Sequence, residues 1–327
     1  FERLRQRVIV ARDQGIYVSI MLFEGWGLQF DGNKWRHHPF NALNNINGIN
    51  GNQNGDSEGT EIHQLKIPAV TTIQEAYVRQ VIDTVNDLDN VLFEICNEDG
   101  GGTMAWQEHF VRFIRNYEKT KPKQHPVGIT PRWDKVTSRS VLEREVFKSS
   151  ADWVSPINTR WRSNPPAQNQ GKVIISDTDH LWGIGGGRDW VWKSFTQGLN
   201  PIFMDPYDDW TLGINKAAAI SIRKAMGHTL SYAKRVNLSK MIPKNSLASS
   251  GYCLAQEKEP YIAEYITYIP SGKSVTMDLS NSSGTLKVEW FDTVTGKRQT
   301  GGIVRGGGSK SFTAPFSKAV LFLQKNP

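Results

Sequence analysis

The stretch VLFEICNED, residues 91–99, constrains the fold most, because an apolar run ends there in an amide and two carboxyl groups. Residues 91–95 predict a strand buried on both faces, which is typical of a parallel sheet covered by helices. A buried carboxylate without a partner is costly, so acids at the end of such a strand favour a place where solvent or a ligand reaches them. Glu98 is therefore the first candidate functional residue. The alternative is that these polar groups only cap the helix that begins near Thr103.

Helical segments alternate with apolar strands from residue 1 to about 240, which predicts parallel βα units of the α/β class. Eight such units close a (β/α)8 TIM barrel of about 250 residues. This chain begins within the second helix of such a barrel, so residues 1–245 are expected to form an incomplete TIM barrel lacking its first two strands. The six strands predicted lie near residues 16–23, 91–95, 126–132, 153–158, 172–180 and 200–207.

An open barrel would expose two sheet edges, which are templates for pairing with another chain. We expect either a preceding segment or a symmetry-related subunit to complete the barrel, and the second case predicts a homo-oligomer. The chain opens with Phe1, and neither an initiator Met nor a signal peptide is visible.

A long loop, a predicted helix start and a change of pattern near residue 246 complete the organisation expected for the chain. A loop rich in Asn and Gly runs from Gly25 to about Val70, and loops of that length are usually functional or mobile. Thr72 and Glu75 form a capping box that predicts the start of the next helix. After about Ser246 the pattern changes to short alternating segments separated by Gly, Ser and Asn. This change predicts a small antiparallel β-sandwich over residues 246–327.

The composition of the chain argues against a membrane partner and against a nucleic acid partner. No apolar run approaches the roughly 20 residues of a membrane span, so no membrane partner is expected. Lys and Arg are spread along the chain without a basic run, so the net charge of +7 is interpreted as aiding solubility, and no nucleic acid partner is expected. Cys96 and Cys253 fall in different predicted domains and imply no disulfide framework.

Carboxyl groups gather at the predicted C-terminal ends of the strands, where a parallel barrel forms its active site. Of these, Glu98 and Asp177 come from opposite sides of a barrel. Two carboxyl groups that face each other across a gap are what glycoside hydrolysis requires, one as proton donor and one as nucleophile or base. The others are Glu24, Asp99, Asp179 and Asp205, of which Asp205 is expected to structure its loop or to contact substrate.

Tryptophan placement is consistent with a sugar ligand. A flat side chain with an N–H group suits a site that is half apolar and half wet, although any single Trp can equally serve ordinary packing. His38, in the long loop, could line a sugar subsite or be solvated. Seven Trp follow predicted strands, namely Trp26, Trp35, Trp106, Trp133, Trp161, Trp182 and Trp210.

The sequence VLFEICNE resembles the fourth-strand signature of the clan of retaining glycoside hydrolases that includes family 5, in which Asn-Glu closes the strand. The resemblance implies that Glu98 is the acid/base and that Asn97 binds the sugar 2-OH. KVIISD, residues 172–177, resembles the seventh strand, where the family has a nucleophilic Glu. Asp177 stands in its place, and Asp179 is the runner-up nucleophile.

The C-terminal segments SGYCLAQ and YIAEYITYIPSGKSVTMDLS resemble the small β-sandwich of apiosidase-like hydrolases that is sometimes labelled collagen-binding. Together the resemblances imply a retaining β-glycosidase of plant or microbial carbohydrate, with a catalytic barrel and neither metal nor cofactor. A polysaccharide-active enzyme would favour a secreted or periplasmic location.

Two alternatives stay open. Asp177, Asp179 and His180 could instead bind a hydrolytic metal ion, since carboxylate and imidazole suit Zn or Mn. The protein could also bind carbohydrate on a degenerate barrel without cleaving it.

Overall fold

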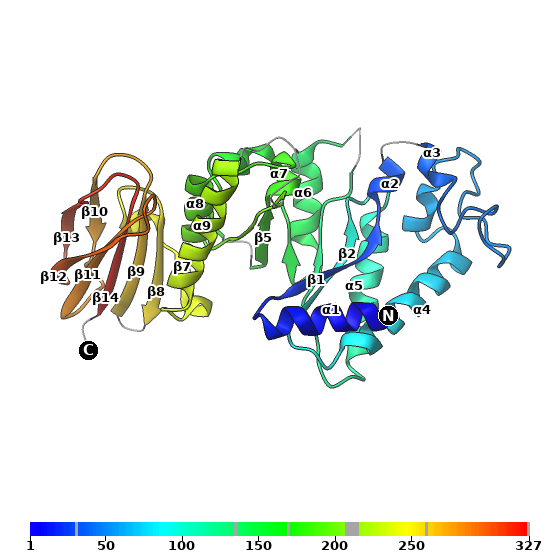
Figure 1. Ribbon diagram of the computed structural model, residues 1–327, viewed down its shortest axis with the longest axis horizontal. Helices are drawn as coiled ribbons and strands as arrows, with labels where there is room; N and C mark the ends of the chain where they lie inside the picture. The colour runs from blue at the N-terminus through cyan, green and yellow to red at the C-terminus, as the bar shows by residue number, and fades with distance from the viewer. Residues whose placement is uncertain (30–31, 134–136, 169–170, 207–215, 259–260, 326–327) are drawn as a thin grey trace. The chain divides into compact units, whose positions relative to one another are not determined.

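The structure is a computed structural model that describes residues 1–29, 32–133, 137–168, 171–206, 216–258 and 261–325 (Figure 1). It divides into two compact units, residues 1–157 and residues 158–327. Within the described ranges, no helix combines the length and the apolar character needed to cross a bilayer.

The first unit is built on four parallel strands in the order β1-β2-β3-β4. Strand β2 is buried on both faces as predicted, since Phe93 and Ile95 on one face and Cys96 on the other are all at 0% exposure. In the β1–β2 register Glu24 lies opposite Asn97, so two polar residues predicted at strand ends meet at one edge of the sheet. The strands span Val18–Glu24 (β1), Val91–Asn97 (β2), Val127–Ile129 (β3) and Trp153–Val154 (β4).

Helices α4 and α5 pack on this sheet through apolar faces, which include Val78 and Ile82 of α4 and Phe110 and Ile114 of α5. Helix α1 lies along β1 in Figure 1, and a hydrogen-bonded ion pair from Arg5 to Asp87 ties it to the end of α4. The elements are α1 (Glu2–Asp13), α2 (Trp26–Gln29), α3 (Gly32–Trp35), the 3-10 helix η1 (Thr60–His63), α4 (Pro68–Val85), α5 (Met104–Glu118) and α6 (Arg139–Lys148).

The predicted capping box at the start of α4 is wrong. The helix begins four residues earlier at Pro68, because a proline at the first helical position already has the helical φ and lacks an N–H that would otherwise be unpaired. Thr72 lies inside the helix and donates its hydroxyl to the Pro68 carbonyl at 3.0 Å. Glu75 binds His109 at 2.9 Å instead of capping the backbone. Helix α5 begins as predicted, with Thr103 accepting from the Trp106 N–H.

The second unit contains two parallel strands followed by antiparallel sheets. The parallel part comprises η2 (Thr159–Arg162), β5 (Val173–Asp177), α7 (Thr178–Trp182), α8 (Arg188–Thr196), β6 (Asn200–Ile202) and α9 (Lys216–Ala233). The 3-10 helices η3 (Leu238–Lys240) and η4 (Asn245–Leu247) flank the first antiparallel strand.

The antiparallel region is a six-stranded sheet in the order β12-β11-β14-β9-β8-β7 and a two-stranded sheet of β10 and β13. Their shared core contains Tyr265, Met277, Leu286 and Leu321, all at 0% exposure. The strands span Met241–Pro243 (β7), Cys253–Lys258 (β8), Tyr261–Ile269 (β9), Ser274–Asp278 (β10), Thr285–Asp292 (β11), Arg298–Arg305 (β12), Ser309–Thr313 (β13) and Ala319–Lys325 (β14).

Parallel βα elements followed by a β-sandwich confirm the predicted fold class in its main features. The absence of two barrel strands stays a prediction. The expected strands at residues 153–158 and 200–207 are shorter than predicted, since β4 and β6 cover only two and three residues.

Strand β1 pairs with β2 on one side, and the described ranges supply no strand for its other side. This edge is apolar, with Met21 at 47%, Tyr17 at 68% and Ile16 at 55% exposure. Residues 16–24 carry neither Lys nor Pro, the residues that commonly protect an edge strand from pairing. We propose that a second copy of this chain pairs with β1 at this edge.

Light scattering on residues 1–327 is expected to give the mass of a dimer or larger assembly. Met21→Lys should dissociate it, because a charge on an edge strand opposes pairing. Val10→Lys, at a residue of α1 that is 63% exposed, should leave the mass unchanged. A monodisperse monomer of the unaltered chain would contradict the proposal.

Candidate active site

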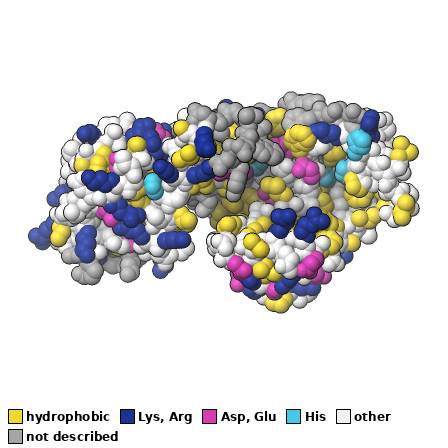
Figure 2. All heavy atoms as spheres, in the orientation of Figure 1, with side chains coloured by type: hydrophobic (Ala, Val, Ile, Leu, Met, Phe, Trp, Pro, Cys, Tyr) yellow, Lys and Arg dark blue, Asp and Glu magenta, His cyan; other side chains and the backbone are white. Residues whose placement is uncertain are grey.

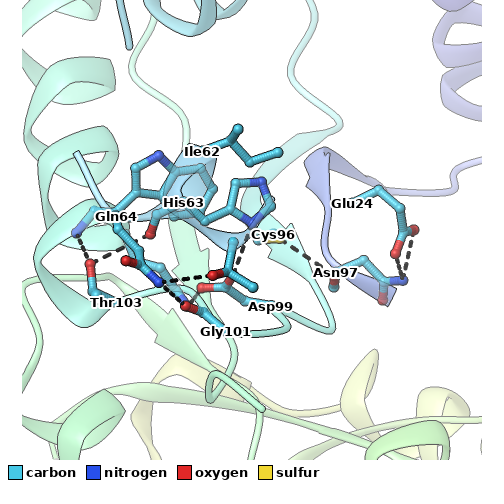
Figure 3. A network of polar contacts seen from close by, with 12 residues as sticks. Glu24, Ile62, His63, Gln64, Cys96, Asn97, Asp99, Gly101 and Thr103 are labelled. Carbon is cyan, nitrogen blue, oxygen red and sulfur yellow. Dashed lines mark hydrogen bonds and ion pairs between the residues drawn. The ribbon is translucent and has the colours of Figure 1, made fainter. Parts of the chain in front are cut away.

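The ends of β1 and β2 are joined through the side chains of Glu24 and Asn97 (Figure 3). The Asn97 amide donates to Glu24 Oε2 at 3.0 Å and lies 3.4 Å from Oε1. The backbone N–H of Trp26 donates to Glu24 Oε1 at 2.6 Å. The Glu24 carboxylate therefore orients the Asn97 amide next to Glu98, the residue predicted to be the acid/base.

The backbone at Glu98 adopts the left-handed conformation, with φ at +42°. This conformation costs a non-glycine residue about 1 kcal/mol or more, so the surroundings must hold it in place. Gly25 contributes directly, because a Cβ atom there would lie 2.4 Å from the Glu98 carbonyl oxygen and 2.5 Å from Asp99 Cα. The end of β1 thus passes against the Glu98 backbone at a distance that only glycine permits.

Asp99 anchors the same segment from the other side and is fully buried. Its Oδ1 lies 3.0 Å from His63 Nδ1, and its Oδ2 accepts from the Gln107 amide at 3.0 Å. The His63 ring is itself stacked on Trp106, with ring centroids 4.2 Å apart. The Asp99 carbonyl accepts from the Trp133 N–H at 2.7 Å. Three segments of the first unit, namely η1, α5 and the segment that contains Trp133, therefore converge on the residue that follows Glu98.

Sequence reasoning missed His63, since no spacing motif links it to residues 97–99. The loop between Gly25 and Val70 contributes it through η1, and the position of η1 depends on packing within that loop. An Asn- and Gly-rich loop predicts function only in general terms.

Three residues of this network are of types that can bind a metal ion. Within the described residues, His63, Cys96 and Asp99 offer ligand atoms that all lie within 4.8 Å of one another. Burial and the neighbouring carboxylates of Asp99 and Glu24 raise the pKa of the Cys96 thiol well above its usual value. The thiol donates to the Asn97 carbonyl at 3.4 Å. Because the His63 Nδ1, Cys96 Sγ and Asp99 carboxylate atoms already hydrogen-bond to one another or to neighbouring protein groups, these contacts fit a hydrogen-bonded support better than a metal centre.

The alternative metal site is not supported. Asp177, Asp179 and His180 do not form a group of this kind in the described part of the chain.

A cavity of about 760 Å³ adjoins Glu24 in the first unit. Its walls are the end of β1, the long loop, η1 and α4, and they are mostly apolar. His38 lies in this wall, stacks on Trp35, and accepts from the Phe40 N–H at 3.1 Å. Its role as a sugar subsite residue stays a prediction. Burial and the nearby His63 lower the pKa of His38 to about 4, so its imidazole is neutral at pH 7. The polar residues of the wall include Glu24, Lys34, His38, Asn44, Asn47 and Tyr77.

The Trp residues of the first unit divide into two groups. Trp26 is 46% exposed and has the Lys34 ammonium 3.0 Å from its ring centroid. Trp133 is half-buried and forms an isolated parallel β-bridge with Gly100, which follows Glu98 by two residues. Trp35 is only 4% exposed, because it forms the centre of the apolar cluster inside the long loop. A ring enclosed in this way has no face for a sugar, so Trp35 is a packing residue and not the rim residue expected.

In the second unit, Asp177 ends β5 and is also the N-cap of α7. Its Oδ1 accepts from the Asp179 N–H at 2.8 Å. Burial is the main cause that raises the pKa of Asp177, and the negative charge of Asp179 adds to it, while His180 and the Asp179 N–H act in the opposite direction. Asp179, His180 and Trp182 lie on α7, and Asp177 is its N-cap, so residues 178–180 are helical and not part of the strand predicted over residues 172–180. All four predicted residues are half-buried.

The remaining predicted site residues are Trp161, Asp205 and Trp210. Trp161 is 2% exposed, and its carbonyl accepts from the Trp190 indole at 3.2 Å, so it belongs to the interior instead of a rim. Asp205 forms two hydrogen bonds of 2.5 Å with Arg223 of α9. This ion pair agrees with a role in structuring its loop. Trp210 lies outside the described residues.

Known proteins resemble this chain in two ways, one family model in sequence and several solved glycoside hydrolases in fold. The family model described as "Putative collagen-binding domain of a collagenase" matches residues 238–321. A family 5 glycoside hydrolase from Bacteroides vulgatus ATCC 8482 is 16% identical with a TM-score of 0.56, over 99% of this chain and 86% of that one. The chain has the fold of these glycoside hydrolases. A "putative glycoside hydrolase" from the same organism gives a TM-score of 0.58 at 10% identity, over 100% of this chain and 63% of that one. No curated protein matches the sequence.

Because Gly25 lies against the Glu98 backbone, adding a side chain at residue 25 should lower the stability of the fold. Gly25→Ala should lower the free energy of unfolding by about 1–3 kcal/mol, because overpacked sites must shift backbone to admit a methyl group. Gly27→Ala is the matched control, since a Cβ there meets nothing within 4 Å, and it should change stability by less than about 1 kcal/mol. Urea denaturation measures both variants. Equal stability of the two would contradict the described packing.

Proposed function

We propose that this protein is a retaining β-glycosidase in which Glu98 is the acid/base and Asp177 is the nucleophile. The observation that carries the proposal is the Asn97–Glu98 pair at the end of β2, with the Asn97 amide oriented by Glu24 and the Glu98 backbone held in a strained conformation. Strained backbone of this kind is concentrated at functional sites. The shared fold supports the same class of enzyme.

The proposed reaction has two steps. In the first, Glu98 gives its proton to the glycosidic oxygen while the Asp177 carboxylate attacks the anomeric carbon, so the leaving group departs as an alcohol and a glycosyl ester forms. In the second, Glu98 accepts a proton from water as that water attacks the anomeric carbon. The ester bond breaks, and both carboxyl groups return to their starting protonation states.

Other predicted residues would bind the sugar. Asn97 is proposed to donate to the 2-OH, and the exposed face of Trp26 and the half-buried Trp133 and Trp182 are proposed to pack on sugar rings. Neutral His38 can exchange hydrogen bonds with hydroxyl groups in the cavity beside Glu24. The proposed substrate class is plant or microbial carbohydrate.

One observation favours a second candidate function, carbohydrate binding without cleavage. Asp177 already caps α7, and its raised pKa disfavours the ionised form that a nucleophile needs. In that case a glycan array would show binding while a panel of aryl glycosides showed no turnover.

Glu98→Gln tests the proposed function directly. The variant keeps the size of the side chain but cannot donate a proton, so hydrolysis of an unactivated substrate should fall by about 10²–10⁴-fold. For a dinitrophenyl glycoside, whose leaving group needs no proton, kcat/KM should fall much less, because kcat/KM reports the first step, whereas kcat should still fall because the attacking water has lost its base. Glu58→Gln, at an exposed residue of the long loop, is the control with unchanged rates. Full activity of Glu98→Gln at an unaltered unfolding temperature would remove Glu98 from the mechanism.

The pH dependence should report Asp177. Because its pKa is raised and the nucleophile must be ionised, kcat/KM should fall with decreasing pH through a value above the usual 3.9 or so for aspartate. Asp179→Asn removes a negative charge that raises this pKa, so the acidic limb should move to lower pH. Asp13→Asn, at an exposed residue of α1, should leave the limb in place. Complete inactivity of Asp179→Asn would instead favour Asp179 as the nucleophile.

A further inference from the structure

The net positive charge of this chain lies in its C-terminal part. The segment that follows α9, residues 234–327, contains 13 Lys and Arg but only 6 Asp and Glu, whereas residues 1–233 contain 26 of each. The whole formal charge of +7 therefore belongs to the last 94 residues. On the face shown in Figure 2, Lys and Arg side chains are spread over the β-sandwich with few acidic side chains among them. Lys and Arg themselves are spread along the whole chain, and the excess of positive charge in this segment comes from its small number of acidic residues.

A groove of about 560 Å³ lies within this basic segment, on the outer face of the six-stranded sheet. Adjacent strands β12, β11 and β14 form its floor, and the turn after α9 forms one side. Three cations line it, Arg235, Lys287 and Arg298, against one carboxylate, Glu289. The groove therefore has two positive charges in excess.

The single carboxylate is already saturated by protein groups. Arg235 donates to both oxygens of Glu289, at 2.7 and 3.0 Å, and the Tyr232 hydroxyl donates at 2.7 Å. Arg298 lies further away, with Nε 3.8 Å from Glu289 Oε1, and its Nη2 donates to the Ser231 hydroxyl at 3.0 Å, which is a neutral partner that leaves its charge in place. Lys287 is exposed, and the Arg298 side chain is 47% exposed. Arg235 thus neutralises Glu289, and the charges of Lys287 and Arg298 remain available to an anion from outside.

The groove also offers neutral hydrogen-bonding groups beside these cations. Gln299 and Thr300 of β12 are exposed, and Gln324 of β14 is half-buried. The result is an open strip that combines amide and hydroxyl groups with cations.

We propose that this groove binds a carboxylated polysaccharide, a polymer of uronic acid residues. A carboxylate on each sugar would pair with Lys287 and Arg298, since a guanidinium presents two parallel N–H donors to a carboxylate. The hydroxyl groups would bind the neighbouring amides. The inference goes beyond the proposed hydrolysis and does not depend on it, because binding is measured without turnover.

Affinity electrophoresis of the full chain in gels containing polygalacturonate tests the proposal. The protein should be retarded by polygalacturonate and at least tenfold less by its fully methyl-esterified form, which has the same backbone without charge. Retardation should also weaken strongly at about 0.5 M salt, where charges separated by more than a few Å are screened. Retention by both polymers alike, or by neither, would overturn the proposal.

Matched variants locate the site. Lys287→Gln should weaken binding by about fivefold or more, and Arg298→Gln by a similar factor. Lys273→Gln removes the same charge from an exposed turn of the sandwich outside the groove and should have less than a twofold effect. Equal losses in Lys273→Gln and Lys287→Gln would show that overall charge acts instead of the groove. Tighter binding of duplex DNA or collagen than of polygalacturonate would also overturn the assignment.

Discussion

The buried carboxylate of Asp99 is the constraint on which the described site depends. It has no contact with solvent, and a buried ionised group without partners would cost several kcal/mol. Its partners come from separate segments, His63 from the long loop and Gln107 from α5. The loop, the helix and the end of β2 can therefore satisfy this charge only when they are assembled together. That assembly fixes the unusual backbone of Glu98, one residue away.

The two proposed catalytic residues lie in contrasting local settings. Glu98 follows a strand whose last side chain, Asn97, is held by a carboxylate, and its own backbone is confined by Gly25. Asp177 is confined in another way, as the cap of a short helix whose N-terminal N–H groups stabilise its ionised form, while burial opposes ionisation. The balance of these two effects sets the pKa of Asp177, and with it the lowest pH at which the proposed enzyme is active. Asp177 is also one methylene shorter than the nucleophilic Glu that the sequence resemblance implies at this position, so the proposed mechanism requires the backbone to bring it closer to the substrate.

Much of this arrangement follows from local sequence patterns. The apolar run of β2 was predictable because such a run is typical of a strand buried on both faces, and polar residues are then expected where it ends. Glu94, buried within the strand, is an exception to this pattern. The sandwich was predictable from alternation of apolar and polar residues. The start of α4 was not, because Pro68 overrides the capping pattern at Thr72. Burial of Trp35 and Trp161 depends on how distant segments pack, and a single aromatic residue after a strand carries no signal of that packing. The His63–Asp99 pair was missed for the same reason.

The proposed roles of Glu98 and Asp177 are tested most directly by azide rescue, with the stereochemistry of the product determined by NMR. In Glu98→Ala with an activated aryl β-glycoside, the glycosyl ester still forms, and azide should attack it to give the β-glycosyl azide. In Asp177→Ala, azide should take the place of the missing carboxylate and give the α-glycosyl azide. These two opposite products are the result that the account predicts. Absence of rescue in both variants, or the same anomer from both, would contradict it.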